Sequence, residues 1–336
     1  MNELRVGVIG FGYTGQLHLA ACRQLSNLHV VGVADPVPHA LEKVPGGVQR
    51  FADYRELLVL DLDLVSVCVP TSLHASIACD ALQAGKHVLI EKPIATTLAD
   101  AERMIAKAAD CNRLLYTGMT HRFYPEIRQA KQRVDDGEIG DVVLIRDSIF
   151  EAVGFLGGPS WYRDKNLAGG GTVLSSGVHL VDRVLWFANR VPTTVSGFTS
   201  NRMLGGEVED TAQMSLGFGA HCAAQLLFGW LAEPHPLVCD LELTGTRGSI
   251  VVHTWQGYET RNAEGVTQYP IYTTESHQEK VLVGLRGEIS EFCDAVREGR
   301  EPWPSVHETT RAIQVVESFY EAARTRTTIQ IGERFG

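Results

Sequence analysis

The sequence predicts an α/β protein with an N-terminal doubly wound parallel sheet and a C-terminal α+β domain built on a large, mostly antiparallel sheet. Short apolar runs alternate with helical patterns through the first third of the chain. Beyond about residue 140, strand-like runs follow one another with turn residues between them, which is typical of antiparallel sheet. Because 336 residues exceed one core of usual size, we expect two domains, 1–122 and 123–336.

Composition is that of a globular protein, with 44% apolar and 21% charged residues. A net charge of −10 without a visible basic patch argues against nucleic acid or an anionic membrane as partner. No apolar run approaches the ~18 residues of a transmembrane helix, and the N-terminus lacks the basic start of a signal peptide. Seven scattered cysteines without a C-x-x-C pair indicate reduced thiols in a cytoplasmic protein, and the histidines and cysteines lack zinc spacing, so no metal site is expected.

The first element is a buried strand over residues 4–9, "LRVGVI". Glycines at positions 10, 12 and 15 follow it at once and open a helical pattern that continues to about residue 25. A second strand, 28–35, ends at Asp35, which lies 20 positions beyond the last glycine. A glycine motif between a strand and a helix, followed by an acid at this distance, indicates a dinucleotide-binding Rossmann unit.

Each residue of this motif has a physical task. Gly10 permits the tight turn, Gly12 lets a pyrophosphate approach the backbone, and Gly15 lets helix and strand pack closely. Amide groups at the helix N-terminus then hold the phosphates. Asp35 suits the two hydroxyls of the adenosine ribose and would repel a 2′-phosphate, and residues 36–38 offer no cation, so NAD is favoured over NADP. The residues between the glycines complete this part of the predicted cofactor site: Phe11, Tyr13 and Thr14.

The alternation continues to about residue 118. The expected elements are strands at 63–70, 86–93 and 114–118, and helices at 72–85 and from Thr97 to about 109, the last opened by a capping pattern with Asp100. Ligands of parallel sheets bind beyond the carboxyl ends of the strands. Lys92 lies at one such end and is therefore the first catalytic candidate.

The motif Glu91-Lys92-Pro93, taken with the glycine motif, closely resembles the glucose–fructose oxidoreductase/inositol dehydrogenase family, Gfo/Idh/MocA. The resemblance runs along the chain through "GFGYTGQLHLAA", "CVPTSLHASIACDALQAGKHVLIEKPIA", "GMTHRFYPEI", "GGGTVLSSGVHLVD" and "WPSVHETTRAIQVVESFYEAART". It implies hydride transfer between nicotinamide and a carbinol carbon of a sugar, cyclitol or related polyol. Lys92 would hydrogen-bond the reacting oxygen, where a cation stabilises alkoxide character. The matched segments also assign these residues to cofactor binding: Pro70, Thr71, His74, Glu91 and Lys92.

The second domain begins with a helical pattern over 125–140. Strand-like runs follow at 141–150, 191–200, 211–230 and 237–255. A last helix, about 306–324, begins with a capping pattern at Ser305 and Glu308 and is a candidate to pack back toward the first domain. The resemblance implies a homodimer or homotetramer formed through the C-terminal sheet.

Aromatic and charged side chains mark the predicted substrate side. Trp161, Tyr162 and Arg163 precede the triple glycine, and rings beside charges suit a sugar, whose CH faces stack on aromatics while its hydroxyls form hydrogen bonds. The alternative, that Trp161 only packs its loop, stays open. Arg122 and Tyr124 are similar candidates just past the domain junction.

"GGGTVLSSGVHLVD" contains the second catalytic candidate, His179, which matches the proton-transfer histidine of the family. The resemblance places an aspartate four residues before it, where this chain has Ser175, and a serine supplies no charge. Three interpretations follow. Ser175 or Ser176 contacts the substrate oxygen; or Asp182, also a substrate-binding candidate, orients the imidazole; or the chain is a sensor that binds NAD and a sugar without turnover. The presence of both Lys92 and His179 favours an enzyme.

Overall fold

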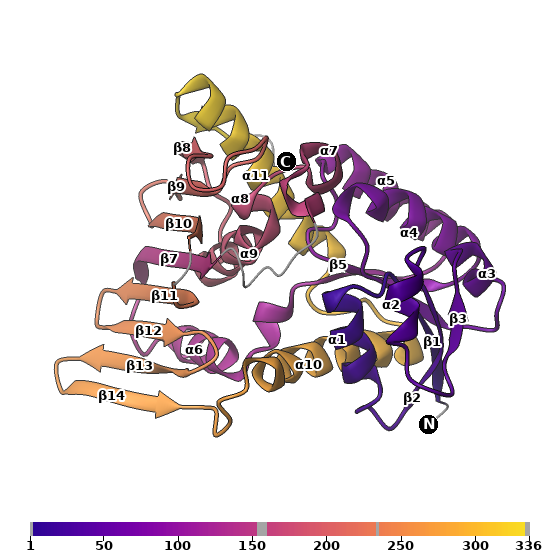
Figure 1. The fold of residues 1–336 in the computed structure, drawn as a ribbon. Coiled ribbons are helices and arrows are strands. Elements are labelled where there is room, and N and C mark those ends of the chain that lie inside the picture. The colour runs from indigo at the N-terminus through magenta and orange to yellow at the C-terminus, as the bar shows by residue number, and fades with distance from the viewer. Residues whose placement is uncertain (1–2, 153–159, 233–234, 333–336) are drawn as a thin grey trace. The chain divides into compact units, whose positions relative to one another are not determined.

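The computed structural model describes residues 3–152, 160–232 and 235–332, and Figure 1 traces the chain from indigo to yellow. The chain divides into two compact units. Unit 1 comprises Met1–Thr120 and Val281–Thr310, and unit 2 comprises His121–Lys280 and Arg311–Gly336. Each unit has its own sheet and its own apolar core.

Unit 1 contains a six-stranded, wholly parallel sheet in the order β3-β2-β1-β4-β5-β6, which confirms the predicted doubly wound sheet. Apart from the short edge strand β3, its strands are almost entirely buried, as their apolar runs require. The order reverses between β1 and β4, and ligands of such sheets bind at this reversal. The strands are β1 (Leu4–Ile9), β2 (Leu28–Ala34), β3 (Gln49–Phe51), β4 (Leu64–Val67), β5 (His87–Glu91) and β6 (Leu115–Gly118).

Helices connect these strands, and Thr97 caps α5 by accepting the Asp100 N–H, as the sequence pattern predicted. α10 is the element that sequence reasoning did not assign to this unit. From Val281 it belongs to unit 1, where Arg286 and Arg297 hydrogen-bond Gln24 and the carbonyl of Asn27. The helices are α1 (Tyr13–Cys22), α2 (Pro38–Glu42), α3 (Tyr54–Leu58), η1 (Thr71–Leu73), α4 (His74–Gln83), α5 (Leu98–Asp110), η2 (Thr120–Phe123) and α10 (His277–Glu298).

Unit 2 contains a nine-stranded sheet in the order β14-β13-β12-β11-β7-β10-β9-β8-β15. It is mostly antiparallel, as predicted, except that β10 runs parallel to β7. The chain leaves β7 through several helices before it returns, and a long crossover of this kind permits parallel pairing. The strands are β7 (Val142–Ala152), β8 (Thr194–Ser200), β9 (Thr211–Gly217), β10 (Ala223–Leu231), β11 (Val238–Gly245), β12 (Ser249–His253), β13 (Gly257–Asn262), β14 (Gly265–Pro270) and β15 (Ile329–Gln330).

Helices cover one face of this sheet. α9 packs against β7 and β10, and α6 packs against β12 and β13 (Figure 1). Buried side chains alternate with partly exposed ones along β9 and with exposed ones along the first part of β10, so the opposite face of these strands is open. The helices are α6 (Pro125–Asp135), η3 (Ser160–Arg163), α7 (Lys165–Ala168), α8 (Thr172–Ser175), α9 (Gly177–Ala188) and α11 (Val306–Thr325), the last beginning in unit 1. Within the described ranges, no helix is long and apolar enough to cross a membrane.

Candidate active site

Of the three motif glycines in the turn after β1, only Gly12 has open space at its Cβ position. A Cβ on Gly10, whose φ is +87°, would lie 2.4 Å from the Cys68 carbonyl oxygen, and a Cβ on Gly15 would lie 2.0 Å from the Gly10 oxygen. Nothing lies within 4 Å of the Cβ position of Gly12, which precedes the first turn of α1. The turn therefore combines a fixed backbone with an open approach to a helix N-terminus, which fits the pyrophosphate of a dinucleotide.

Asp35 follows β2 at the same sheet edge. Its Oδ2 accepts the Phe11 N–H at 2.7 Å and its Oδ1 accepts the Val37 N–H at 2.8 Å. The carboxylate is thereby held against the glycine turn, where an acid can also accept ribose hydroxyls. The Phe11 side chain is buried, so its backbone faces the turn, whereas Tyr13 is exposed at the start of α1.

The loops after β4 and β5 are joined by His74. Its Nδ1 lies 2.9 Å from the Pro93 carbonyl oxygen and its Nε2 lies 3.0 Å from that of Val69. Burial lowers the pKa of His74, and the contacts with these carbonyl oxygens oppose that shift. The side chain is therefore placed to support the two loops that contain Pro70 and Lys92. Thr71 is buried beside it, at the start of η1.

Lys92 follows β5 directly and is half-buried, at the carboxyl edge where the parallel fold predicted it. Its backbone N–H donates to Oε2 of Glu91 at 3.1 Å. Because β1, β4 and β5 are neighbours in the sheet, Lys92 shares this edge with the glycine turn.

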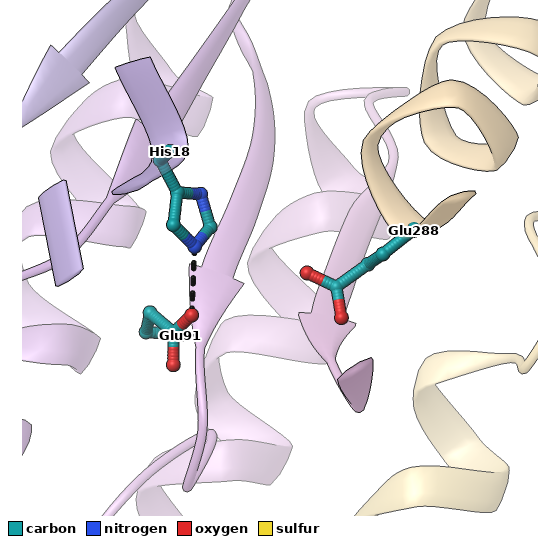
Figure 2. A group of neighbouring side chains, drawn as sticks. All are labelled: His18, Glu91 and Glu288. Atoms are coloured by element: carbon teal, nitrogen blue, oxygen red, sulfur yellow. Dashed lines mark hydrogen bonds and ion pairs between the residues drawn. The ribbon is translucent and has the colours of Figure 1, made fainter. Parts of the chain in front are cut away.

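Beneath this edge lies a buried cluster that the sequence did not reveal (Figure 2): His18 from α1, Glu91 from β5 and Glu288 from α10. His18 Nε2 is 2.7 Å from Glu91 Oε1, and its Nδ1 is 2.8 Å from the Ser66 hydroxyl. Glu288 is fully buried, and its Oε2 accepts the Thr120 hydroxyl at 2.9 Å. Its Oε1 has no hydrogen-bond partner among the residues that the structure describes.

The cluster contains separated charges. Although burial opposes ionisation of both groups, Cys68 and Glu91 raise the pKa of His18 well above its usual value, and His18 lowers that of Glu91. Burial and the nearby Glu91 charge raise the pKa of Glu288 to about 8. At neutral pH, Glu288 is therefore protonated beside an imidazolium–carboxylate pair. Glu91, which the sequence resemblance assigns to cofactor binding, hydrogen-bonds His18 and accepts the backbone N–H of Lys92.

In unit 2, His179 lies in an aromatic group at the start of α9. Its ring stacks on that of His121 with centroids 4.0 Å apart and planes within 2°. Tyr124 and Trp255 contact His121 in turn, at 5.3 and 5.8 Å. His179 is buried, and its backbone N–H donates to the Ser176 carbonyl at 3.3 Å. The structure thus brings together the two predicted residues His179 and Tyr124.

Asp182 pairs with Arg122. Its two oxygens accept Arg122 Nε and Nη2 at 2.7 and 2.8 Å, and both side chains are buried. The guanidinium also lies 5.1 Å over the Trp186 ring. Both Asp182 oxygens accept from this guanidinium, so Asp182 fixes the orientation of Arg122. That Asp182 also orients the His179 imidazole stays a prediction.

The predicted aromatic segment forms η3. The rings of Trp161 and Tyr162 stack with centroids 3.9 Å apart, both are half-exposed, and Arg163 is exposed. Asp164 then caps α7 by accepting the Asn166 N–H. This geometry agrees with both interpretations of Trp161, because a stacked and half-exposed pair can support a loop and still present a ring to a sugar.

The triple glycine is anchored by Glu209, which sequence reasoning missed. Its carboxylate accepts the N–H groups of Gly171 and Val173 at 3.0 and 3.1 Å and the Tyr320 hydroxyl at 2.9 Å. A Cβ on Gly171 would lie 1.8 Å from the Glu209 carbonyl oxygen. The turn therefore needs glycine for close backbone packing.

Two family models match the chain: "Oxidoreductase family, NAD-binding Rossmann fold" over residues 4–119, and "GFO/IDH/MocA C-terminal domain" over residues 127–251. The chain belongs to the Gfo/Idh/MocA oxidoreductase family. Its N-terminal part is thus a member of the NAD-binding Rossmann group, as the glycine motif and Glu91-Lys92-Pro93 indicated.

Relatives of this oxidoreductase span its whole length. It is 23% identical over 351 aligned positions to inositol 2-dehydrogenase of Rhizobium meliloti, covering 98% of this chain and 99% of the relative. It is 26% identical to scyllo-inositol 2-dehydrogenase (NAD⁺) of Bacillus subtilis, covering 90% and 88%. An oxidoreductase from Agrobacterium radiobacter, crystallised with NAD⁺, L-tartaric acid and magnesium, has the same fold, with a TM-score of 0.89 at 19% identity over 99% of this chain and 100% of that one.

One further carboxylate of this oxidoreductase meets the segment with the predicted serine. Ser175 ends α8 and is half-buried, and the next residue, Ser176, donates its hydroxyl to Oε2 of Glu151 at 2.6 Å. Glu151 is buried near the end of β7. The sequence signal that could have revealed it is an acid at an inward-facing position of β7, in an alternating row with Ile145, Asp147 and Ile149.

Proposed function

We propose that this oxidoreductase uses NAD to interconvert a secondary alcohol and a ketone on a sugar, cyclitol or related polyol. The observation that carries the proposal is in unit 1, where the open approach at Gly12, the carboxylate of Asp35 and the amine of Lys92 follow strands of one parallel sheet at its carboxyl edge. Inositol dehydrogenases among the relatives support the substrate class.

The cofactor, when bound, supplies a nicotinamide that exchanges hydride with the carbinol carbon. The residues of this chain handle the proton and the oxygen. The Lys92 ammonium donates a hydrogen bond to the reacting oxygen and stabilises its developing negative charge. His179 accepts the hydroxyl proton during oxidation and returns it during reduction, and Ser175 hydrogen-bonds the same oxygen.

The remaining predicted residues hold the polyol. Tyr124 and the Trp161–Tyr162 pair offer ring faces to its CH groups, and Arg163 offers donors to its hydroxyls. Asp182 keeps the Arg122 guanidinium in one orientation through two hydrogen bonds.

The decisive experiment is steady-state turnover of a polyol panel that includes myo-inositol, scyllo-inositol and levoglucosan, with NAD and with NADP. We expect NADH formation with at least one polyol. Lys92→Ala should abolish that turnover while NAD binding, measured by calorimetry, changes little. Tight NAD binding without turnover of any panel member would instead support the sensor, and full turnover by the variant would refute the assignment of Lys92.

We further propose a cytoplasmic homodimer or homotetramer. The seven cysteines are all free thiols, which suits a reducing compartment. The open face of the unit 2 sheet presents apolar side chains such as Phe198 and Leu227, and an exposed apolar face suits an interface between copies.

A further inference from the structure

The carboxylate expected four residues before His179 is absent from the sequence, and the structure offers another one nearby. Asp182 is directed to Arg122 and Glu209 to the triple glycine. Glu151 instead meets the serine turn, the pair Ser175–Ser176, through a hydrogen bond of 2.6 Å from the Ser176 hydroxyl.

The course of β7 explains how this contact arises. Ile145, Asp147, Ile149 and Glu151 occupy alternate positions of β7 and are all buried. Asp147 binds Arg183 of α9 at 2.5 and 3.0 Å, so this row of side chains faces α9.

The distance between the two contact residues on β7 is similar to the distance between their partners along α9. From Asp147 to Glu151 the strand advances about 13 Å, and from Arg183 back to Ser176 the helix covers about 10 Å. α9 therefore lies along β7 with its N-terminus at the carboxyl end of the strand. Glu151 reaches the helix at the turn that leads to His179.

We propose that Glu151 is a positioning residue for the reaction: its charge stabilises the imidazolium of His179, and its hydrogen bond through Ser176 fixes the turn before that histidine. A buried carboxylate requires compensation, and the N-terminus of the 12-residue α9 supplies part of it. A base that gains a proton during alcohol oxidation is stabilised by a nearby anion. Glu151 on β7 thus supplies the negative charge that an acid at position 175, at the end of α8, would supply in its place.

The inference rests on the proposed function for its kinetic readout, so the test also needs a readout without turnover. The histidine NMR signals of the full-length protein, with His179 assigned from a His179→Asn variant, give the midpoint of its titration. Glu151→Gln keeps an oxygen that accepts from Ser176 but removes the charge. We expect the midpoint and the acidic limb of alcohol oxidation to move to lower pH by about half a unit or more, and kcat to fall about tenfold or more with little change in KM.

Two variants separate charge from hydrogen bonding. Ser176→Ala leaves the carboxylate and should lower kcat without moving the midpoint. Ser175→Asp in the Glu151→Gln background returns a carboxylate to the turn and should restore part of kcat and of the midpoint. Glu242→Gln, at the carboxylate that pairs with the exposed Arg146, removes a charge elsewhere on the same sheet and should change neither.

The outcomes are distinguishable. An unchanged midpoint and kcat in Glu151→Gln, or a lower melting temperature as its only effect, would overturn the inference. Glu151 would then have only a structural role, through its hydrogen bond with Ser176. A shifted midpoint in a protein that turns over no polyol would support Glu151 while refuting the proposed function. Normal polyol turnover, with a His179 midpoint that Glu151→Gln does not shift, would support the proposed function and refute the role of Glu151.

Discussion

At the scale of single residues, we expect Asp35 to determine the choice between NAD and NADP. Asp35 presents a buried carboxylate that already accepts the N–H groups of Phe11 and Val37. An additional phosphate on the ribose would meet this negative charge, and residues 36–38 supply no cation to offset it.

Replacing Asp35 should therefore change cofactor choice. Asp35→Ser removes the charge and shortens the side chain, so we expect NAD affinity to fall about tenfold or more and the preference for NAD over NADP to shrink by a larger factor. Calorimetric titration of each cofactor measures both. Asp35→Asn is the matched control, since it keeps the size of the side chain while removing its charge. Unchanged discrimination in both variants would contradict the role of this carboxylate.

Reasoning from the sequence proposed the charged residues of this site, but it missed the carboxylates that hydrogen-bond the neighbouring turns. Asp35 and Lys92 stand directly after apolar strands, and a local pattern is enough to mark them. Glu151 and Glu209 act through partners 25 and 38 positions away in the chain. Such partners depend on how a strand and a helix pack, and no local periodicity contains that information.

At the scale of elements, two glycines of the β1–α1 turn have different tasks: one is needed for packing, and the other leaves space for a ligand. Gly15 has no room for a Cβ, whereas the Cβ position of Gly12 is open. Gly15→Ala should therefore lower the melting temperature by several degrees because helix and strand are forced apart. Gly12→Ala should leave the melting temperature nearly unchanged and weaken NAD binding about tenfold or more, because the methyl group occupies the phosphate approach.

Thermal unfolding and NAD calorimetry of the two variants provide the test, each variant serving as the other's control. Equal loss of stability in both would show that the turn is only structural. Equal and unimpaired NAD binding would show that the pyrophosphate does not approach at Gly12.

Sequence patterns predicted β1, α1 and β2 around this turn because the buried apolar runs and the glycine motif are local features of the sequence. α10 was missed for a different reason. Its helical pattern is local, but its place against unit 1 depends on contacts with Gln24 and Asn27, more than 250 positions earlier. The same docking inserts Glu288 beside His18 and Glu91, so this cluster could not be predicted either.

The insertion of Glu288 makes the stability of unit 1 depend on pH. Burial and Glu91 raise its pKa from the ordinary 4.5 to about 8, while His18 and Thr120 also face it. Between these values the folded protein keeps a proton that the unfolded chain loses. The contribution of protonated Glu288 to the free energy of unfolding is thus fully present below about pH 4.5 and is lost as pH rises through about 8.

Glu288→Gln removes this dependence, since an amide resembles the protonated acid at every pH. We expect the variant to gain free energy of unfolding relative to the wild type as pH rises, by up to about 1.4 kcal/mol per pH unit. Urea unfolding at about pH 5.5 and about pH 8.5 measures the difference, and other titrating groups cancel between the two proteins. Parallel pH profiles for wild type and variant would contradict the assignment.

At the scale of the whole molecule, the open face of the unit 2 sheet is the feature that a single chain leaves unexplained. Phe198 pairs across β8 and β9 with Gln213, and Gln213 pairs across β9 and β10 with Leu227, so the three form one row on the open face. Phe198 is 65% exposed and Leu227 is 38% exposed. Apolar side chains in such a row favour burial against a second copy of the sheet.

The double variant Phe198→Glu with Leu227→Glu should therefore convert the oligomer to single chains, because it places charges in the centre of the contact. Sedimentation equilibrium gives the mass directly. Val59→Glu, at a position 83% exposed in unit 1, introduces the same side chain away from this sheet and should leave the mass unchanged. NAD affinity, which depends on the sheet edge of unit 1, should be the same in all three proteins. A wild-type protein with the mass of one chain, or an oligomer that survives both charges, would mean that copies of this enzyme do not meet through the open face.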